Sequence, residues 1–380
     1  MYQEPNATIE HTKIKCINCA GNLKYDPSKT SLVCEYCGTI NEMPSLPQDF
    51  EIQEIDLESF LQEQKTNIAV QQTIITVSCT NCAAATTLPP NVSSSNCPFC
   101  DTPLIVQNAT THQVIKPKYL LAFQNTQKNA HQLFKDWAGT LWFAPNDLTQ
   151  KLKDAEKMRG VYIPYWTYDA QTDTAYTGQR GDDYFETEYI RDENGNSQAV
   201  TVTKTRWRSV SGRVDKFFDD VLVHASNSLP QEYVAELEPW DLEELKPFDE
   251  MYLAGFITET YQIDIKKGLD VAKDIMEGGI RYAINRDIGG DHQTILSMRT
   301  NYYDTTFKHI LLPIWISAYR YKDKVYRFMV NGRTGEVQGE RPYSVWKIVF
   351  LSIAVIAVIA ALLYLYSENN DGGHVRYRRR

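Results

Sequence analysis

The middle of the chain is dominated by segments in which apolar and polar residues alternate. These segments are rich in Tyr, Trp, Val and Thr. A period of two, combined with β-branched and aromatic residues, predicts half-buried strands. The predicted strands lie in residues 160–178, 199–226 and 292–339, with turns expected around Asn194, at 321–325 and at 331–335.

Apolar residues spaced three and four apart predict several helices. We expect one at residues 126–137 with Asn125 as its cap, one at 147–159 and one near 265–284. A further short helix is expected at residues 56–67. Together with the strands, these helices predict an α+β body with antiparallel strands.

Two strand segments share a Pro-x-Trp pattern, within residues 162–166 and 312–315. One interpretation is a weak internal repeat that packs Trp166 and Trp315 in related core positions. The other is two unrelated edge strands that each start at a proline, because proline is tolerated at sheet edges. The sequence leaves both interpretations open.

The most apolar segment covers residues 348–366, which contain no charged side chain. An uninterrupted helix of that length measures about 28 Å, close to the hydrocarbon thickness of a bilayer. Tyr343 and Trp346 precede it and two tyrosines close it, where interfacial aromatics are expected. We predict one transmembrane helix at 347–366. A buried core helix is the alternative, but such a helix usually keeps a polar stripe.

All eight cysteines fall in the first hundred residues and form a repeat. Each copy reads CxxC, fourteen residues, CxxC, and corresponding cysteines are 63 positions apart. The predicted metal ligands are Cys16, Cys19, Cys34 and Cys37 in the first copy, and Cys79, Cys82, Cys97 and Cys100 in the second. Paired CxxC motifs without an apolar N-terminal leader indicate metal ligands rather than disulfides, and thioredoxin-like redox motifs do not come in spaced fours.

Two CxxC pairs suit a tetrahedral Zn²⁺ held by four thiolates about 2.3 Å away, the arrangement of a zinc ribbon. Four protein ligands leave no position for water. We therefore expect two structural Zn²⁺ ions that supply folding free energy, no other cofactor and no catalytic residue. Pairing inside each copy is favoured, although the sequence leaves open a site shared between the copies.

These segments predict six parts. They are zinc ribbon 1 at residues 12–40, a linker with a short helix at 41–72, zinc ribbon 2 at 73–104, the α+β body at 112–345, the transmembrane helix at 347–366 and a basic tail at 367–380.

The formal net charge is −9, although the tail contains four arginines. An acidic body repels a phosphate backbone, and neither ribbon offers a basic face with interleaved aromatics. Nucleic acid is therefore not the expected partner. The chain contains no P-loop, GxGxxG, GxSxG or HExxH sequence, so the usual nucleotide-binding and hydrolase signatures are absent.

Three polar segments could carry chemistry. Residues 178–183 hold two acids beside two glycines, which we interpret as a solvated hairpin loop rather than a metal site. Asp220 and His224 share a strand face but lie about 13 Å apart, too far for an acid–base pair. The acidic run at 240–250 is interpreted as an exposed helix or loop, with a docking surface for a basic partner as the alternative.

We expect a single-pass protein of the cell membrane with its body in the cytoplasm. The N-terminus has no apolar leader, and free thiols suit a reducing compartment. The positive-inside rule disagrees mildly, because the tail holds four arginines. Either the short tail is translocated regardless of its charge, or it returns to anionic lipid.

The chain resembles a family of bacterial tail-anchored zinc-ribbon membrane proteins, often labelled primosomal-protein-N′-like or transcription-factor-B-type zinc-ribbon proteins. The resemblance lies in the two ribbons, in residues 160–169 followed by Gly178, Arg180 and Gly181, and in residues 331–335 before the anchor. The missing ATPase motifs exclude the helicase activity that the first label suggests. The doubled ribbon departs from single-ribbon relatives.

The resemblance implies a partner of the phage-shock protein A type, an ESCRT-III-like membrane-remodelling protein. The expected function is a non-enzymatic adaptor that recruits such a soluble protein, or binds another membrane protein, at the lipid bilayer during envelope stress. The alternatives are a membrane-tethered nucleic-acid-binding regulator and an enzyme sited in the α+β body.

Overall fold

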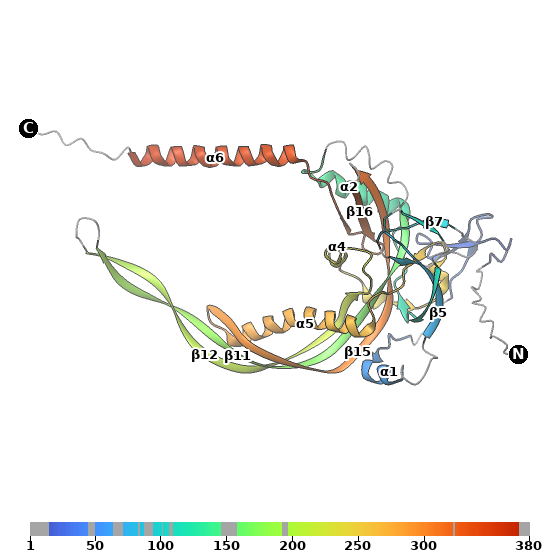
Figure 1. Cartoon of the computed structure of the whole chain (residues 1–380), viewed down its shortest axis with the longest axis horizontal. Helices are drawn as coiled ribbons and strands as arrows, with labels where there is room; N and C mark the ends of the chain where they lie inside the picture. Colours follow the sequence, from blue (N-terminus) through green and yellow to red (C-terminus); the bar gives the residue numbers. More distant parts are fainter. Residues whose placement is uncertain are drawn as a thin grey trace, which may run out of the picture.

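The computed structural model describes residues 15–44, 50–63, 71–82, 84–86, 94–100, 102–105, 109–145, 158–191, 197–321 and 324–371. It is a mixed α/β structure with mainly antiparallel strands, two four-cysteine clusters and one apolar C-terminal helix, which confirms the expected fold class. Figure 1 shows a body from which a long curved arm and the C-terminal helix α6 (Val345–Asp371) extend in the same direction.

A nine-stranded sheet forms the centre of the body. Its long strands are β11 (Arg159–Arg191), β12 (Ser197–His224) and β15 (His292–Tyr321), which pair antiparallel in the order β12-β11-β15. The short strands are β4 (Ile55–Asp56), β10 (Tyr119–Leu120), β13 (Lys246–Pro247), β14 (Ile257–Thr258), β16 (Lys324–Asn331) and β17 (Val337–Gly339). The strands predicted from alternation are therefore confirmed.

The arm is the outward continuation of the three long strands. β15 pairs with β11 as far as Gly181, and beyond that residue β11 pairs with β12 alone. Helix α5 (Ile265–Ile288) lies along one face of the three-stranded part, where Ile280 and Ile284 pack on Tyr176 of β11. The helix predicted near 265–284 is confirmed, and its N-cap Asp264 accepts hydrogen bonds from two backbone N–H groups of the first turn.

Residues 178–183 are not the hairpin loop that their polarity predicted, because they lie inside β11. The glycines serve close packing instead. A Cβ at Gly178 would lie 2.6 Å from the carbonyl oxygen of Thr294 on β15 and 2.9 Å from Ile288 of α5. Glycine is required where another backbone approaches a strand, and in sequence that requirement is hard to distinguish from a turn.

The helix predicted at 126–137 is α2 (Gln127–Thr140), but Asn125 is not its cap. The hydroxyl of Thr126 accepts the hydrogen bond from the backbone N–H of Asn129 instead. Asn125 is used elsewhere, because its side-chain amide donates to the carbonyl oxygen of Arg333 at 2.8 Å.

The predicted spacer helix is α1 (Leu57–Glu63), and residues 64–70 lie outside the described part. Residues 146–157, which hold most of the helix predicted at 147–159, and the turn around Asn194 also lie outside it.

The two Pro-x-Trp segments pair with each other in the middle of the sheet, so neither belongs to an edge strand. Tyr162 lies opposite Pro313. Trp315 packs around Phe123 in one core cluster, whereas Trp166 packs with α5 in another. The edge-strand interpretation is therefore wrong. The tryptophans do hold corresponding positions, because the indole N–H of Trp166 donates to the carbonyl oxygen of Ile263 just before the N-cap of α5, and that of Trp315 donates to the carbonyl oxygen of Asn125 just before the N-cap of α2.

The cysteine repeats fold into small sheets and hairpins. The first forms β1 (Leu23–Asp26), β2 (Ser31–Cys34) and β3 (Ile40–Asn41), and the second lies among β5 (Gln71–Ser78), β6 (Ala85–Thr86), β7 (Ser94–Asn96), β8 (Pro103–Ile105) and β9 (Ala109–Ile115).

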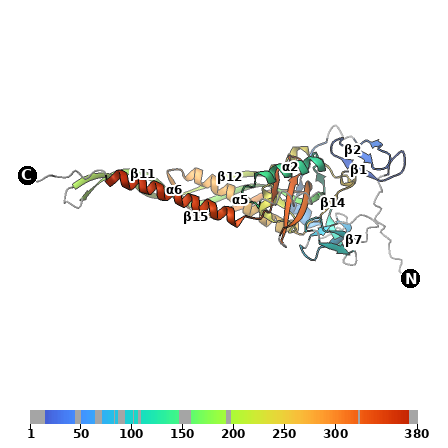
Figure 2. The same cartoon turned by 90° about the horizontal axis from the view of Figure 1, so that it is seen from above.

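The central sheet has a separate hydrophobic core on each face, since neighbouring strand residues point to opposite sides. Tyr162 and Trp315 belong to one core, and Ile163 belongs to the other. Buried residues of the first ribbon, such as Tyr25, join the first core, and those of the second, such as Phe99, join the second core. The two ribbons therefore lie on opposite faces of the sheet, as Figure 2 shows for β1, β2 and β7.

Candidate metal centres and membrane helix

The first cysteine cluster brings together all four sulfurs of its copy. Sγ of Cys16 lies 3.6 Å from Sγ of Cys37, and Sγ of Cys19 lies 3.4 Å from Sγ of Cys34. Four thiolates around a tetrahedral Zn²⁺ would stand about 3.8 Å apart. The ligand atoms of the cluster all lie within 4.8 Å of one another, so the geometry fits a four-coordinate ion held within one copy.

The backbone around the first cluster is shaped by the sulfurs. The N–H of Asn18 donates to Sγ of Cys16 at 3.4 Å. Gly21 lies close to the sulfurs, and a Cβ there would stand 3.2 Å from Sγ of Cys19 and 3.3 Å from Sγ of Cys34. In this turn a backbone N–H group points toward the sulfurs, and the space beside Gly21 is too small for a side chain.

A threonine two residues after the last cysteine supports each cluster. The hydroxyl of Thr39 lies 3.1 Å from Sγ of Cys37 and lowers the pKa of that thiol to about 6. Thr102 holds the corresponding place 3.2 Å from Sγ of Cys100. A lowered thiol pKa favours the thiolate, which is the form that binds zinc.

The second cluster has the same arrangement in a more buried setting. Sγ of Cys79 lies 3.5 Å from Sγ of Cys100, and Sγ of Cys82 lies 3.6 Å from Sγ of Cys97. The hydrogen bond with Cys97 lowers the pKa of Cys82 to about 5. Two four-cysteine clusters that could hold zinc are thus formed within single copies.

Each ribbon is joined to the body by backbone hydrogen bonds. In the first, the N–H of Tyr25 donates to the carbonyl oxygen of Ala254 at 3.0 Å. In the second, the N–H of Thr260 donates to the carbonyl oxygen of Ala85 at 2.9 Å. With their side chains in the body's cores, the ribbons are parts of the folded body, which suits a structural role for the metal.

Glu259 is a buried acid beside the second ribbon that sequence reasoning missed. Its side chain is 1 % exposed, and the hydroxyl of Ser226 donates to Oε1 at 2.6 Å. Burial raises the pKa of Glu259 to about 8. The carboxyl group is therefore protonated at neutral pH, which avoids a buried charge.

A second missed feature is the buried cation Lys308 at the root of the arm, 2 % exposed. Its Nζ lies 2.7 Å from Asp220, 3.2 Å from Glu54 and 3.7 Å from Asp169. Oxygens of Glu54, Asp169 and Asp219 come within metal-binding distance of one another, but the lysine already supplies a cation there. In the sequence, the feature that could have indicated this buried cation is a lysine within the apolar run of β15.

The remaining residues that the sequence singled out do not form a shared site. Asp220 pairs with Lys308, while His224 packs against the ring of Tyr165 with centroids 5.3 Å apart. In the acidic run, Asp241 forms an ion pair with Arg333, a residue that is only 7 % exposed. Part of that run therefore holds the turn at 331–335 in place.

The apolar segment forms one helix that is long and apolar enough to span a membrane. The most apolar 18 residues within Val345–Tyr366 have a mean hydropathy of 3.0, and none of these 18 is buried against the body. In its first turn, Nζ of Lys347 donates to the carbonyl oxygens of Trp142 and Ala144 at 3.0 and 2.8 Å. A helix so exposed and so apolar is not a core helix of this body.

Comparison with known proteins gives one informative likeness. The chain is similar to "Uncharacterized protein YdjG" of Bacillus subtilis (strain 168), with 26 % identity over 339 residues, which cover 88 % of this chain and 91 % of the relative. No family model matches the chain, and no solved structure does. The likeness extends over nearly the full length of both proteins.

Proposed function

We propose that this protein is a membrane-anchored adaptor that brings a soluble protein to the cytoplasmic membrane surface. The observation that carries the proposal is the end of the arm, residues 182–191 and 197–207, which we call the distal ribbon. Among the described residues, no third strand and no helix covers this ribbon beyond its base, where His292 of β15 contacts Asp183 and Trp207. A two-stranded ribbon is marginally stable alone, so an exposed apolar face on it favours a partner.

The distal ribbon has two unlike faces, because residues paired across strands share a face. One face carries the pairs Phe185 with Thr203, Thr187 with Thr201 and Tyr189 with Ala199. Phe185 and Tyr189 are 79 % and 75 % exposed, and Trp207 nearer the body is 47 % exposed. We call this the aromatic face. It offers large rings, the composition of interface anchors, with the charged residues Asp183 and Arg191 only at its two ends.

The opposite face is charged and internally paired. Nζ of Lys204 lies 2.8 Å from Glu186 and 2.6 Å from Glu188. The guanidinium of Arg206 lies 5.0 Å above the ring of Tyr184. Because these charges neutralise one another, the aromatic face is the side that remains for contact.

α6 supplies the membrane attachment, and the thiolate clusters suit a cytoplasmic body. Charged side chains such as Glu186 and Lys204 are costly in hydrocarbon, so the arm stays outside the bilayer. In Figure 1 the arm and α6 point the same way, and insertion therefore turns α6 relative to the arm. The attachment at Lys347 in the first turn lets the remainder of the helix swing.

The partner that the family resemblance implies is a soluble protein of the phage-shock protein A type, acting in membrane stress. The test uses the full chain reconstituted in vesicles and a purified protein of that type, measured by flotation. Combined Phe185→Ser, Tyr189→Ser and Trp207→Ser substitutions should lower recruitment at least tenfold, since large anchors are removed. Tyr184→Ser, on the charged face, is the matched control.

Full recruitment by the triple variant would contradict the assignment of the aromatic face. Recruitment that is equal in vesicles without the chain would contradict the adaptor function. Tight DNA binding by the reconstituted chain with a steep salt dependence would replace it with nucleic-acid binding.

A further inference from the structure

β12 is an edge strand of the central sheet, and its last residues border a cavity of about 380 Å³. We call this cavity the β12 slot. Five consecutive residues from Asp220 to His224 line it, together with residues of α4 (Gln231–Ala235), Glu238, and Val271 and Ile275 of α5. A cavity that follows a strand edge over five residues, about 16 Å, has the shape of an extended chain.

The backbone at this edge has hydrogen-bonding groups to offer. The N–H of Ala225 donates to the carbonyl oxygen of Pro164 at 2.9 Å, which makes these two a hydrogen-bonded pair. Because antiparallel pairs alternate, His224 opposite Tyr165 and Leu222 opposite Thr167 are non-hydrogen-bonded pairs. The N–H and C=O groups of Leu222 and His224 therefore point away from β11, into the slot.

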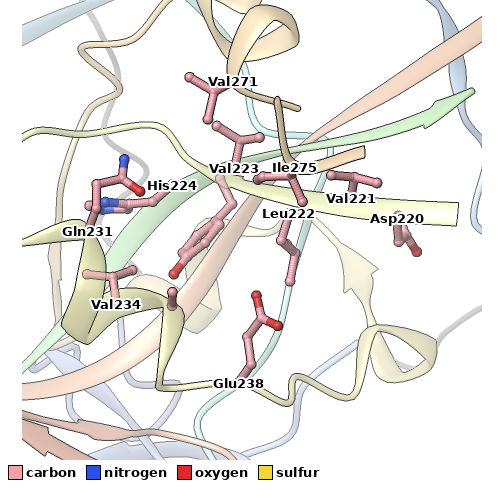
Figure 3. A pocket seen from close by; sticks show the side chains of 12 residues that line it. Asp220, Val221, Leu222, Val223, His224, Gln231, Val234, Glu238, Val271 and Ile275 are labelled. Atoms are coloured by element: carbon pink, nitrogen blue, oxygen red, sulfur yellow. The ribbon is translucent and has the colours of Figure 1, made fainter. Parts of the chain in front are cut away.

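The two walls of the slot come from opposite faces of the sheet. Figure 3 shows Val271 and Ile275 of α5 on one side of the strand, and Val234 and Glu238 on the other. Ile275 is 51 % exposed although it lies beside this strand. A chain paired with β12 would direct alternate side chains to the α5 wall and to the α4 wall.

Buried polar groups in the slot lack partners. The hydroxyl of Tyr165 and both ring nitrogens of His224 have no hydrogen bond among the described residues, though these side chains are only 3 % exposed. Buried polar atoms normally form hydrogen bonds, and an added strand, or water held beneath it, could supply the missing partners. They are the independent sign that the slot holds a ligand.

The charge of the slot selects among ligands. Among the described residues that line it, the charged ones are Asp220 and Glu238, and none is a lysine or arginine. Asp220 is already paired with Lys308. Glu238 is therefore the lining carboxylate that is available to pair with a cation of the ligand. Its carboxylate points toward the middle of the slot in Figure 3, and burial raises the pKa of Glu238. A cationic side chain on the α4 side would pair with it.

We propose that the β12 slot binds an extended segment of a partner protein, about five residues long, by strand addition. Apolar side chains of the segment face Val271 and Ile275, and a basic one faces Glu238. The inference rests on the proposed adaptor function only in that the recruited protein supplies the segment. The slot lies at the root of the arm and is separate from the aromatic face.

The test measures binding of a fluorescent peptide, acetyl-Ser-Val-Lys-Val-Lys-Val-Ser-amide, to the full chain in detergent micelles by anisotropy. We expect saturable binding. Methylation of alternate peptide amides should weaken it at least tenfold, because strand addition needs those N–H groups. Replacing both lysines of the peptide by glutamate should weaken it as much.

Two variants of the chain sharpen the result. Leu222→Pro removes an N–H that points into the slot and spares the ladder with β11, so it should abolish binding. Glu238→Gln should weaken binding about fivefold even if the proline variant folds poorly, and Glu236→Gln, outside the slot, should not. Zinc content and circular dichroism check the fold of each variant.

Equal binding of the N-methylated peptide, or no saturable binding at millimolar peptide, would overturn the slot proposal. Flotation of the partner with intact chain would then still support the adaptor function. Conversely, peptide binding without any recruitment of the partner would support the slot proposal and contradict the adaptor function.

Discussion

The two four-cysteine ribbons have the same cysteine spacing but different surroundings. In the first, Cys19 and Cys37 are exposed, whereas in the second Cys79, Cys97 and Cys100 are all buried. The first packs on one face of the central sheet and the second on the other. The same pair of CxxC motifs can therefore form an exposed cluster at the periphery or a buried cluster within a core. Which of the two forms depends on what the residues between the motifs contact.

The largest difference between the ribbons should follow loss of a ligand. Cys97→Ser removes a sulfur that lies in the same core as Ile163 and Ile310, so metal loss should unfold that side of the sheet. Structural zinc contributes on the order of 10 kcal/mol to small domains. We expect the variant to lose cooperative thermal unfolding and most soluble yield.

Cys37→Ser is the matched change in the first ribbon. Its exposed sulfur is peripheral, so we expect one Zn²⁺ to remain and the body to unfold cooperatively within a few degrees of the wild type. Differential scanning calorimetry with metal analysis distinguishes the two variants. Equal loss of stability in both would show that the difference in burial has no energetic consequence.

The protonated Glu259 beside the second ribbon should make stability depend on pH. Its pKa is raised from 4.5 to about 8, so the folded state holds a proton that the unfolded state releases between those values. Stability should therefore fall as pH rises, by up to about 1.4 kcal/mol per pH unit from this group. Glu259→Gln should remove this part of the fall in zinc-saturated protein.

The measurement is thermal unfolding at pH 6 and pH 8 for wild type and Glu259→Gln. The wild type should lose more stability between the two values than the variant does. Parallel losses would show that Glu259 is ionised in the folded protein. Titration of the zinc ligands is common to both proteins and cancels in the difference.

The smallest effect is expected where the ribbons differ by one methyl group. Gly21 in the first corresponds, 63 residues on, to Ala84 in the second. A Cβ at Gly21 would press on the ring of Tyr36 at 2.7 Å and on two sulfurs. Gly21→Ala should weaken zinc binding at the first site about threefold to tenfold, measured by competition with a chromogenic chelator. Unchanged affinity would mean that the exposed Tyr36 moves aside freely.

The parts of the molecule that depend on local pattern could be predicted from sequence. The cysteine spacing, the apolar helix and the alternation in β11, β12 and β15 each express one periodicity or one ligand chemistry. The strand at 178–183 could not be recognised, because its glycines are required by close neighbours that are distant in sequence, such as Thr294 and Ile288 beside Gly178.

The groups around Lys308 and Glu259 could not be predicted either, because they also depend on contacts between residues that are distant in sequence. Lys308 contacts acids from three separate segments, and Glu259 accepts a hydrogen bond from Ser226, which lies 33 residues earlier in the chain. The sequence also could not show that the two ribbons lie on opposite faces of one sheet, since that depends on which side chains of the body receive Tyr25 and Phe99.

The central claim is that eight thiolates hold two structural metal ions on opposite faces of one sheet. Metal analysis of the reduced full-length chain, purified in detergent without added metal, tests it most directly. The account predicts two Zn²⁺ per chain, falling to one in Cys37→Ser without loss of the folded body. Fewer than two Zn²⁺ in a correctly folded wild-type chain would contradict it.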